Sequence, residues 1–185
     1  MATFFGLCDA SGNPTGSASD NNGGSGVSVW NNTAVEVFTC PGAGSQTLSE
    51  ISADVHLSSG TANIRCAVYS SDGSTLIAQG TAAVALSGAV DSWQGHTSQA
   101  TITPNPATLT GGTTYILIAS ASGGSGTTAT DHADSTANSL KFDGTDRTGG
   151  YAGALPAGTT GNPMWPVRAA VTAAIASNQL AWTKG

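Results

Sequence analysis

Residues 106–120 read PATLTGGTTYILIAS, and this stretch decides the fold class. A polar run leads into Gly111-Gly112, and the apolar segment 115–119 follows almost at once. Five consecutive apolar residues after a turn signal are typical of a strand that is buried on both faces. The run is too short to span a bilayer, and the Gly and Thr residues before it argue against a helix. We therefore expect a central strand of a β-sheet, entered through a glycine corner.

Alternating segments accompany this strand. Residues 48–57 alternate apolar and polar side chains, which predicts an antiparallel strand with one buried face. Ser58-Ser59-Gly60 predicts a turn, so we expect residues 61–69 to form the partner strand, with Arg65 facing outward. The expected inner faces of the two strands are Ile51, Ala53, Val55 and Leu57, and Ala62, Ile64, Cys66 and Val68. A slip of one residue would send Arg65 into the core, so the register is well specified.

Further turn and strand signals recur along the chain. Asp72-Gly73 predicts a hairpin turn. Residues 165–175 alternate over eleven positions, with Arg168 on the outer face, and the β-branched Val167 and Val171 favour a strand over a helix. We count eight to ten short strands and almost no helical periodicity. The sequence thus predicts an all-β protein, an antiparallel β-sandwich of jelly-roll type.

The N-terminal region differs from the rest. Phe4, Phe5 and Leu7 form a small apolar anchor, and a stretch rich in Gly, Ser and Asn follows. We expect residues 1–26 to be an extended arm whose anchor binds a neighbouring subunit; an edge strand of the chain's own domain is an equal alternative. The sandwich is assigned to residues 27–176 and a short tail to residues 177–185.

Composition restricts the partners and the location. The net charge is −6, and the five basic residues are scattered, so neither nucleic acid nor a membrane surface is an expected partner. The start lacks the features of a secretory signal, so synthesis in a host cytoplasm is expected. Three widely spaced cysteines, Cys8, Cys40 and Cys66, do not suggest zinc, and we interpret them as free thiols, with one disulfide as the alternative.

Two runs carry a family resemblance. Residues 65–69 read RCAVY and precede the Asp72-Gly73 turn, and residues 109–117 read LTGGTTYIL. Over residues 48–175 the chain resembles a jelly-roll module of phage virion proteins and bacterial surface proteins. In that module these runs form core strands and turns, so the resemblance implies the fold more than an activity. Related modules serve as decoration, fibre or carbohydrate-binding domains.

Signals for catalysis and metal binding are weak. No nucleophile motif or phosphate loop is present, and the three histidines stand in plain polar contexts, so we expect no enzyme and no cofactor. Two acidic pairs in expected loops are weak Ca²⁺ candidates, although carboxylates that cap loops explain them as well. These residues are Asp131, Asp134, Asp143 and Asp146.

These observations lead to two expected functions. The first is a structural virion protein, a bacteriophage capsid decoration (cement) or fibre subunit, located in the virion and forming a homo-oligomer such as a trimer. The second is a carbohydrate-binding module, for which Trp30, Trp93 and Tyr151 would supply a stacking platform. Packing of the same aromatic residues in the core or at an interface is the competing interpretation.

Overall fold

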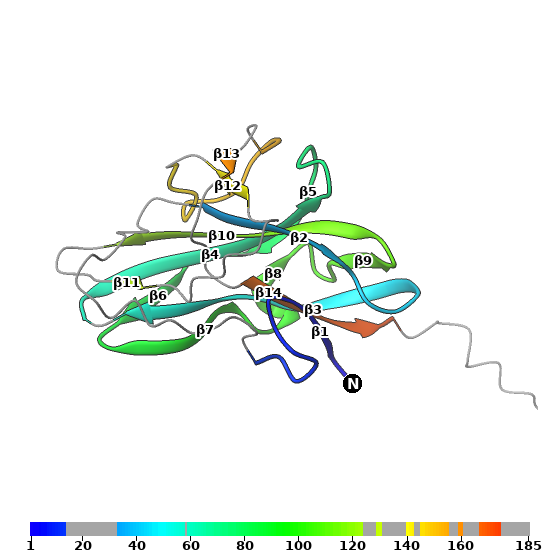
Figure 1. Ribbon diagram of the computed structural model, residues 1–185, viewed down its shortest axis with the longest axis horizontal. Helices are drawn as coiled ribbons and strands as arrows, with labels where there is room; N and C mark the ends of the chain where they lie inside the picture. The colour runs from blue at the N-terminus through cyan, green and yellow to red at the C-terminus, as the bar shows by residue number, and fades with distance from the viewer. Residues whose placement is uncertain are drawn as a thin grey trace, which may run out of the picture.

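A computed structural model shows two antiparallel β-sheets packed face to face (Figure 1). The structure describes residues 1–13, 33–57, 59–123, 129–130, 140–142, 145–155, 159–160 and 167–174. Strands account for nearly all the regular structure there, with one short 3-10 segment, η1 (Gln99–Thr101). The predicted all-β sandwich is confirmed; its jelly-roll type stays a prediction. The predicted tail, residues 177–185, lies outside the described residues.

Within the described residues, the two sheets contain six and eight strands. The six-stranded sheet consists of β1 (Thr3–Gly6), β14 (Val167–Ala173), β3 (Gly44–Leu57) and β11 (Ala129–Thr130), with β7 (Val90–His96) and β9 (Thr108–Gly111) also paired to β3. The eight-stranded sheet consists of β13 (Thr159–Thr160), β12 (Leu140–Phe142), β2 (Thr33–Thr39), β10 (Thr114–Gly123), β4 (Thr61–Ser70), β5 (Leu76–Gly80) and β8 (Ile102–Thr103), with β6 (Val84–Ser87) paired to β4.

Strand β10 is the central strand that the sequence predicts. It pairs with β2 on one side and with β4 on the other, so its backbone groups have neighbours on both edges. Leu117 and Ala119 face the main core between the sheets, whereas Ile116 and Ile118 belong to a second apolar cluster on the outer face. This double burial explains why the segment is apolar at every position and not at alternate ones.

The predicted glycine corner carries the chain from one sheet to the other. Strand β9 pairs with β3 in the six-stranded sheet, and β10 lies in the eight-stranded sheet. Gly112 has a φ of 77°, a conformation that glycine adopts without steric cost. A Cβ at Gly111 would lie 2.5 Å from the carbonyl carbon of Gly42, so only glycine fits there. The Tyr115 hydroxyl accepts a hydrogen bond from the backbone N–H of Thr110 at 2.8 Å and fixes the corner.

The expected pairing of residues 48–57 with residues 61–69 is wrong. The first segment belongs to β3 and the second to β4, and these strands lie in opposite sheets. The predicted inner faces are nevertheless confirmed, because both sets of residues are buried in the same core. The two apolar faces meet across the sandwich and not side by side. Alternation reports which face is buried, and it does not report which strand is the hydrogen-bonded neighbour.

The last alternating strand, β14, pairs with β3 and confirms the predicted inward positions Val167, Ala169 and Val171. The register shifts between Ala170 and Val171. On β3 the extra residue is Ser49, whose hydroxyl donates to the carbonyl of Ala170 at 3.1 Å. This bulge lets both Leu48 and Ile51 face the core although three positions separate them.

The N-terminal segment is an edge strand of the chain's own sheet. Residues Thr3 to Gly6 pair antiparallel with β14, which is the alternative that the sequence left open for the predicted arm. Residues 14–32 lie outside the described part of the chain.

The three cysteines are free thiols, with Cys40 and Cys66 buried, as predicted. The described residues include no helix long and apolar enough to cross a membrane.

Candidate interaction site at the N-terminal strand

Strand β1 docks on β14 with alternating side chains. Phe5 lies opposite Ala169 and enters the main core, where it is buried. Phe4 lies opposite Ala170 on the outer face. The ladder continues one residue further, because the N–H of Leu7 donates to the carbonyl of Val167 at 3.0 Å. Two of the three predicted anchor residues, Phe4 and Phe5, therefore contact opposite faces of the chain's own six-stranded sheet.

A row of four paired residues crosses the outer face of this sheet. Gly6 pairs with Arg168, Arg168 with Ser52, and Ser52 with Gly95, so glycines stand at both ends of the row. A Cβ at Gly6 would lie 2.3 Å from the Val167 carbonyl oxygen, and one at Gly95 would lie 2.4 Å from the Ile51 carbonyl oxygen. Both glycines also have positive φ values. The neighbouring backbone therefore leaves room for glycine alone at both ends of this row.

The guanidinium group of Arg168 is enclosed by four groups. Its Nη2 lies 2.7 Å from Glu50 Oε1, and its Nε donates to the same oxygen at 2.7 Å. The guanidinium carbon lies 4.8 Å from the centre of the Phe4 ring and 4.3 Å from that of the Trp93 ring. Its Nη1 donates to the carbonyl of Gly12. Each ring contact of a partly desolvated guanidinium group adds roughly 1–2 kcal/mol of attraction to that of the ion pair.

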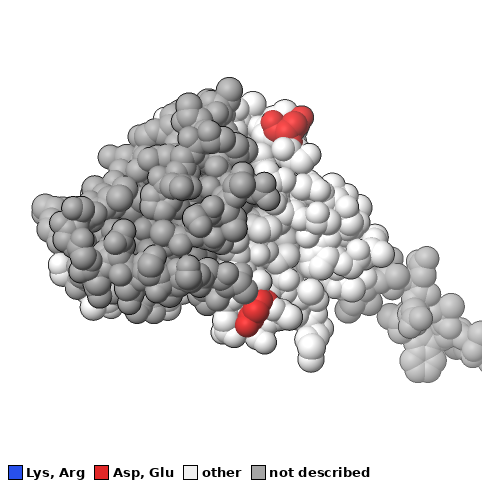
Figure 2. Space-filling view, in the orientation of Figure 1, with Lys and Arg blue, Asp and Glu red and all other residues white. Residues whose placement is uncertain are grey.

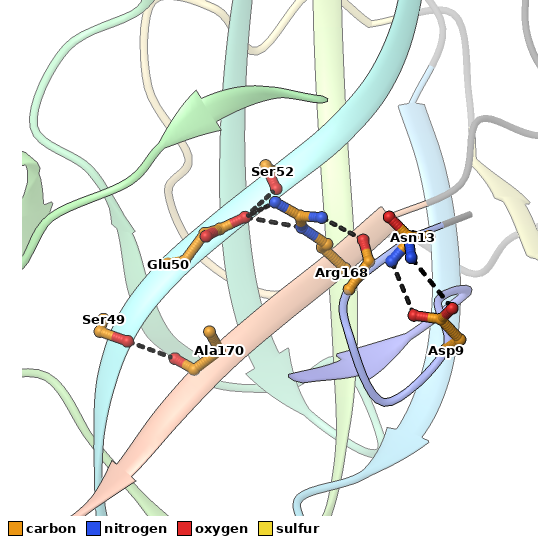
Figure 3. Close-up of polar contacts among 8 residues, drawn as sticks. Asp9, Asn13, Ser49, Glu50, Ser52, Arg168 and Ala170 are labelled. Atoms are coloured by element: carbon orange, nitrogen blue, oxygen red, sulfur yellow. Dashed lines mark hydrogen bonds and ion pairs between the residues drawn. The ribbon is translucent and has the colours of Figure 1, made fainter. Parts of the chain in front are cut away.

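A compact loop brings the Gly12 carbonyl to Arg168 (Figure 3). The Asp9 carboxylate accepts hydrogen bonds from the N–H groups of Ser11 and Asn13, both at 2.8 Å, and from the Asn13 side-chain amide at 3.1 Å. These bonds stabilise the ionised form and lower the pKa of Asp9. A Cβ at Gly12 would lie 3.0 Å from Arg168 Nη1 and 3.1 Å from the Phe4 ring, so the loop packs closely on the cation.

Arg168 and its neighbours are largely shielded from solvent. The side chains of Arg168 and Glu50 are only 14% and 13% exposed. Ser52 donates a hydrogen bond to the same Glu50 oxygen at 2.7 Å. Burial raises the pKa of the neighbouring Cys8 thiol to about 11, although the nearby Arg168 charge opposes the shift. Cys8 is therefore an unreactive thiol at neutral pH. We call these residues, from Phe4 to Gly12 with Glu50, Ser52, Trp93 and Arg168, the Arg168 clamp.

A second structured region lies on the outer face of the eight-stranded sheet. Tyr151 packs edge-on against Tyr69 with ring centres 6.2 Å apart, and its hydroxyl donates to the Arg65 carbonyl at 3.0 Å. Its backbone N–H and carbonyl bond to the Gln79 amide at 2.9 and 3.2 Å. Residues 145–155 thus cover the sheet, and the Leu155 N–H donates to the Gly73 carbonyl at 2.8 Å.

Arg65 links the covering segment, residues 145–155, to the eight-stranded sheet. Its guanidinium group donates to the carbonyls of Gly80 at 2.8 and 3.1 Å, of Thr81 at 3.3 Å and of Thr148 at 3.3 Å. The side chain faces outward as predicted, but it is buried and serves as a structural cation. It donates hydrogen bonds to backbone carbonyl oxygens that are shielded from water and would otherwise have no donor.

His96 is buried between the sheets. Its Nε2 accepts a hydrogen bond from the Cys66 backbone N–H at 3.3 Å, which requires the neutral ring. Burial, together with the Arg65 charge, lowers its pKa from 6.5 to about 4. A Cβ at Gly80 would lie 1.9 Å from this nitrogen, so glycine provides the space for the ring. The sequence context of His96 is polar and gives no sign of this burial.

The structure separates the aromatic residues of the predicted glycan platform. Tyr151 is buried on the eight-stranded sheet, whereas Trp93 lies on the six-stranded sheet with one ring face stacked on Arg168. The Trp93 indole N–H is itself buried and has no hydrogen-bond partner. The two residues therefore do not form one platform, because each packs in a different layer of the protein. Trp30 lies outside the described residues.

Of the predicted Ca²⁺ candidates, only Asp146 lies within the described residues. Its carboxylate accepts hydrogen bonds from the Thr148 N–H at 2.8 Å and from the Thr148 hydroxyl at 2.6 Å, which is the loop-capping role. Among the described residues no three His, Cys, Asp or Glu side chains gather as metal ligands. Asp131, Asp134 and Asp143 lie outside the described part.

The described surface visible in Figure 2 is mainly free of charged residues, and only two small, separate acidic groups stand out on it. Comparison with known protein families, curated proteins and solved structures yields no match. The description of the Arg168 clamp therefore rests on the contacts in this structure alone.

The sequence placed Arg168 on the outer face of its strand but did not connect it with Phe4, Glu50 or Trp93. The available signal was an isolated arginine on an alternating strand in a chain with only five basic residues.

Proposed function

We propose that this chain is a structural subunit of a virus particle, a bacteriophage capsid decoration or fibre protein that binds neighbouring subunits. The observation that carries the proposal is the N-terminal edge strand. In the described part of the chain, strand β1 is joined to the body through its ladder with β14, the buried Phe5 and the Arg168 clamp. An element held by a few defined contacts at a sheet edge suits subunit contacts, because edge strands present unpaired backbone groups to a further chain.

Three further features support this proposal. The runs that carry the virion-module resemblance lie in the central strands β4 and β10 and at the β9–β10 corner. The chain has only 9% charged residues, which suits a surface that packs against other protein. Buried polar groups such as Arg65 and His96 are engaged with backbone atoms and hold the scaffold together.

Sedimentation of particles tests the proposal. Particles of the virus that carries this sequence are purified on a density gradient, and the chain is quantified by peptide mass spectrometry. We expect the chain to sediment with the particles in a fixed ratio to the major capsid protein. A chain found only at the top of the gradient would refute the virion role.

A pair of deletions tests the role of the N-terminal segment in the same assay. We expect loss of residues 1–13 to reduce incorporation at least about tenfold, whereas removal of the tail at residues 177–185 serves as the matched control. Circular dichroism and thermal unfolding first establish that both shortened chains are folded. Equal incorporation of both chains would show that the N-terminal segment is not needed for binding to the particle.

A further inference from the structure

We propose that β1 exchanges between copies of this chain, so that Thr3–Gly6 of one copy docks on β14 of a second copy. The inference rests on the proposed function and deepens it, because the exchanged strand would link adjacent subunits of a particle. The partner is thus a second copy of this chain. The receiving site is the edge of β14 together with Glu50, Ser52, Trp93 and Arg168, the members of the Arg168 clamp that lie outside the N-terminal segment.

The receiving site is specific for this N-terminal sequence. Phe5 fills a position in the core, and Phe4 covers one face of the Arg168 guanidinium group. Gly6 is required by the closeness of the Val167 carbonyl, and the Gly12 carbonyl accepts from Arg168. A strand that lacked this order of residues would lose the core contact, the stacking or the hydrogen bond. The site therefore selects the N-terminus of this chain over an unrelated strand.

The connection between β1 and the body is long enough for exchange. Residues 14–32, about 19 residues, separate the described N-terminal segment from β2. A chain of that length spans up to about 60 Å when fully extended, compared with a diameter of roughly 40 Å for a domain of this size. The β4–β5 hairpin, by contrast, has five residues between Ser70 and Leu76. Among the described strands, β1 is thus an element that can reach a neighbouring copy without unfolding the body.

Exchange conserves the contacts that hold β1. The ladder, the buried Phe5 and the clamp would be identical whether β1 comes from the same chain or from a second one. The balance then depends on the effective concentration of each strand, which is in the millimolar range for a strand on a connector of this kind. Copies fixed side by side in a particle reach comparable local concentrations, so the exchanged form can compete there. In dilute solution the strand of the same chain prevails.

Disulfide trapping tests the exchange. Thr3 lies opposite Val171 in the ladder. One variant carries Thr3→Cys and a second, differently tagged variant carries Val171→Cys, both with Cys8→Ser. The two full-length chains are refolded together at concentrations from roughly 10 μM to 1 mM, which approach the effective concentration of the tethered strand, and are then oxidised. We expect a mixed disulfide dimer whose yield rises with concentration.

Two controls make the result decisive. A single chain with both Thr3→Cys and Val171→Cys must form an intrachain disulfide, which establishes the β1–β14 register. A matched pair, Thr61→Cys and Ser87→Cys, joins exposed opposite positions of β4 and β6 within the body and is expected to give at least about tenfold less mixed dimer. Equal yields from both pairs, no mixed dimer at any concentration, or no intrachain disulfide would each overturn the proposal.

The experiment separates this proposal from the virion role. If purified chains form mixed dimers but the chain is not found in particles, the virion role is refuted and the strand exchange is supported. A chain that sediments with particles but yields no mixed dimer would do the reverse.

Discussion

The Arg168 guanidinium group and the Glu50 carboxylate meet at 2.7 Å, although 118 positions separate them in the sequence. The contact joins β14 to β3, and it lies under Phe4 of β1 and beside Trp93 of β7. One ion pair therefore holds together side chains from four strands. Both side chains are largely shielded from water, so loss of either partner leaves a poorly solvated charge. Removal of one partner should therefore destabilise the protein more than it would at an exposed ion pair.

Replacement of Arg168 tests the clamp. We expect Arg168→Ala to lower the free energy of unfolding by about 2–4 kcal/mol, since it removes the ion pair, both ring contacts and the Gly12 bond. Arg168→Lys keeps the charge but loses the planar stacking and the two-nitrogen contact, so it should be intermediate. Urea unfolding measures both variants. A double-mutant cycle with Glu50→Ala should show a coupling of roughly 1 kcal/mol or more, and strict additivity would contradict the contact.

Acidification should destabilise the protein through His96. Its pKa is about 4 in the folded chain and 6.5 in the unfolded chain, so the unfolded state binds an extra proton between these values. Stability is therefore complete above pH 6.5 and falls as the pH drops toward 4, by about 3 kcal/mol at most.

A pH series of urea unfolding, with His96→Asn as comparison, measures this contribution. The variant should be less stable at pH 7 and show a flatter curve between pH 6.5 and 4. The lowered pKa of Asp72, about 2, acts at lower pH and is retained in the variant. Parallel curves for the two proteins in the upper window would show that His96 does not titrate there.

Gly80 should tolerate no side chain. A methyl group at this position would overlap His96 Nε2, and the His96 ring is buried. We expect Gly80→Ala to destabilise the protein by about 3 kcal/mol, because packed interiors accommodate extra atoms poorly. Gly149→Ala is the matched control, since nothing lies within 4 Å of the added carbon. Thermal unfolding compares the two, and similar melting temperatures would argue against the packing described.

The hydroxyl of Tyr115 should stabilise the glycine corner. Tyr115→Phe leaves the Thr110 N–H without its acceptor, which we expect to cost about 1–2 kcal/mol. Hydrogen exchange offers a local readout, because the Thr110 amide should exchange faster in the variant while amides of β3 lose protection only in proportion to global stability. Unchanged exchange at Thr110 would show that water or another group replaces the hydroxyl.

The burial of individual strands could be predicted, because it follows from the residue pattern of each strand alone. The apolar run at 115–119 predicted a strand with neighbours on both faces, and the alternating segments predicted which residues face the core. Pairing between strands was less accessible. The segment ending at Leu57 and the segment beginning at Thr61 look like a hairpin, yet they enter different sheets, because burial of their apolar faces is satisfied equally well across the sandwich.

The candidate site could not be predicted because its members are distant in sequence. Phe4 and Phe5 stood out as an apolar pair, and Arg168 as an outward cation, but only the register of β1 on β14 brings them together. The choice between the two interpretations of Tyr151, a glycan platform or packing, could not be made from the sequence for a related reason. Its segment has no strand periodicity, and the hydrogen bonds to Gln79 and Arg65 that bury it come from another part of the chain.

The repeated passage of the chain between the two sheets has a kinetic consequence. Strand β3 must pair with β14, and β2 with β10, so the main ladders join segments that are far apart along the chain. Loop-closure entropy is lost before such contacts form, and proteins of this kind fold in milliseconds to seconds. A nascent chain would hold β3 without β14 until residues 167–173 have been made, although β7 and β9 can pair with β3 earlier. Completion of the six-stranded sheet therefore has to wait for β14, and β1, which precedes β14 in the chain, cannot take its place in the sheet before then.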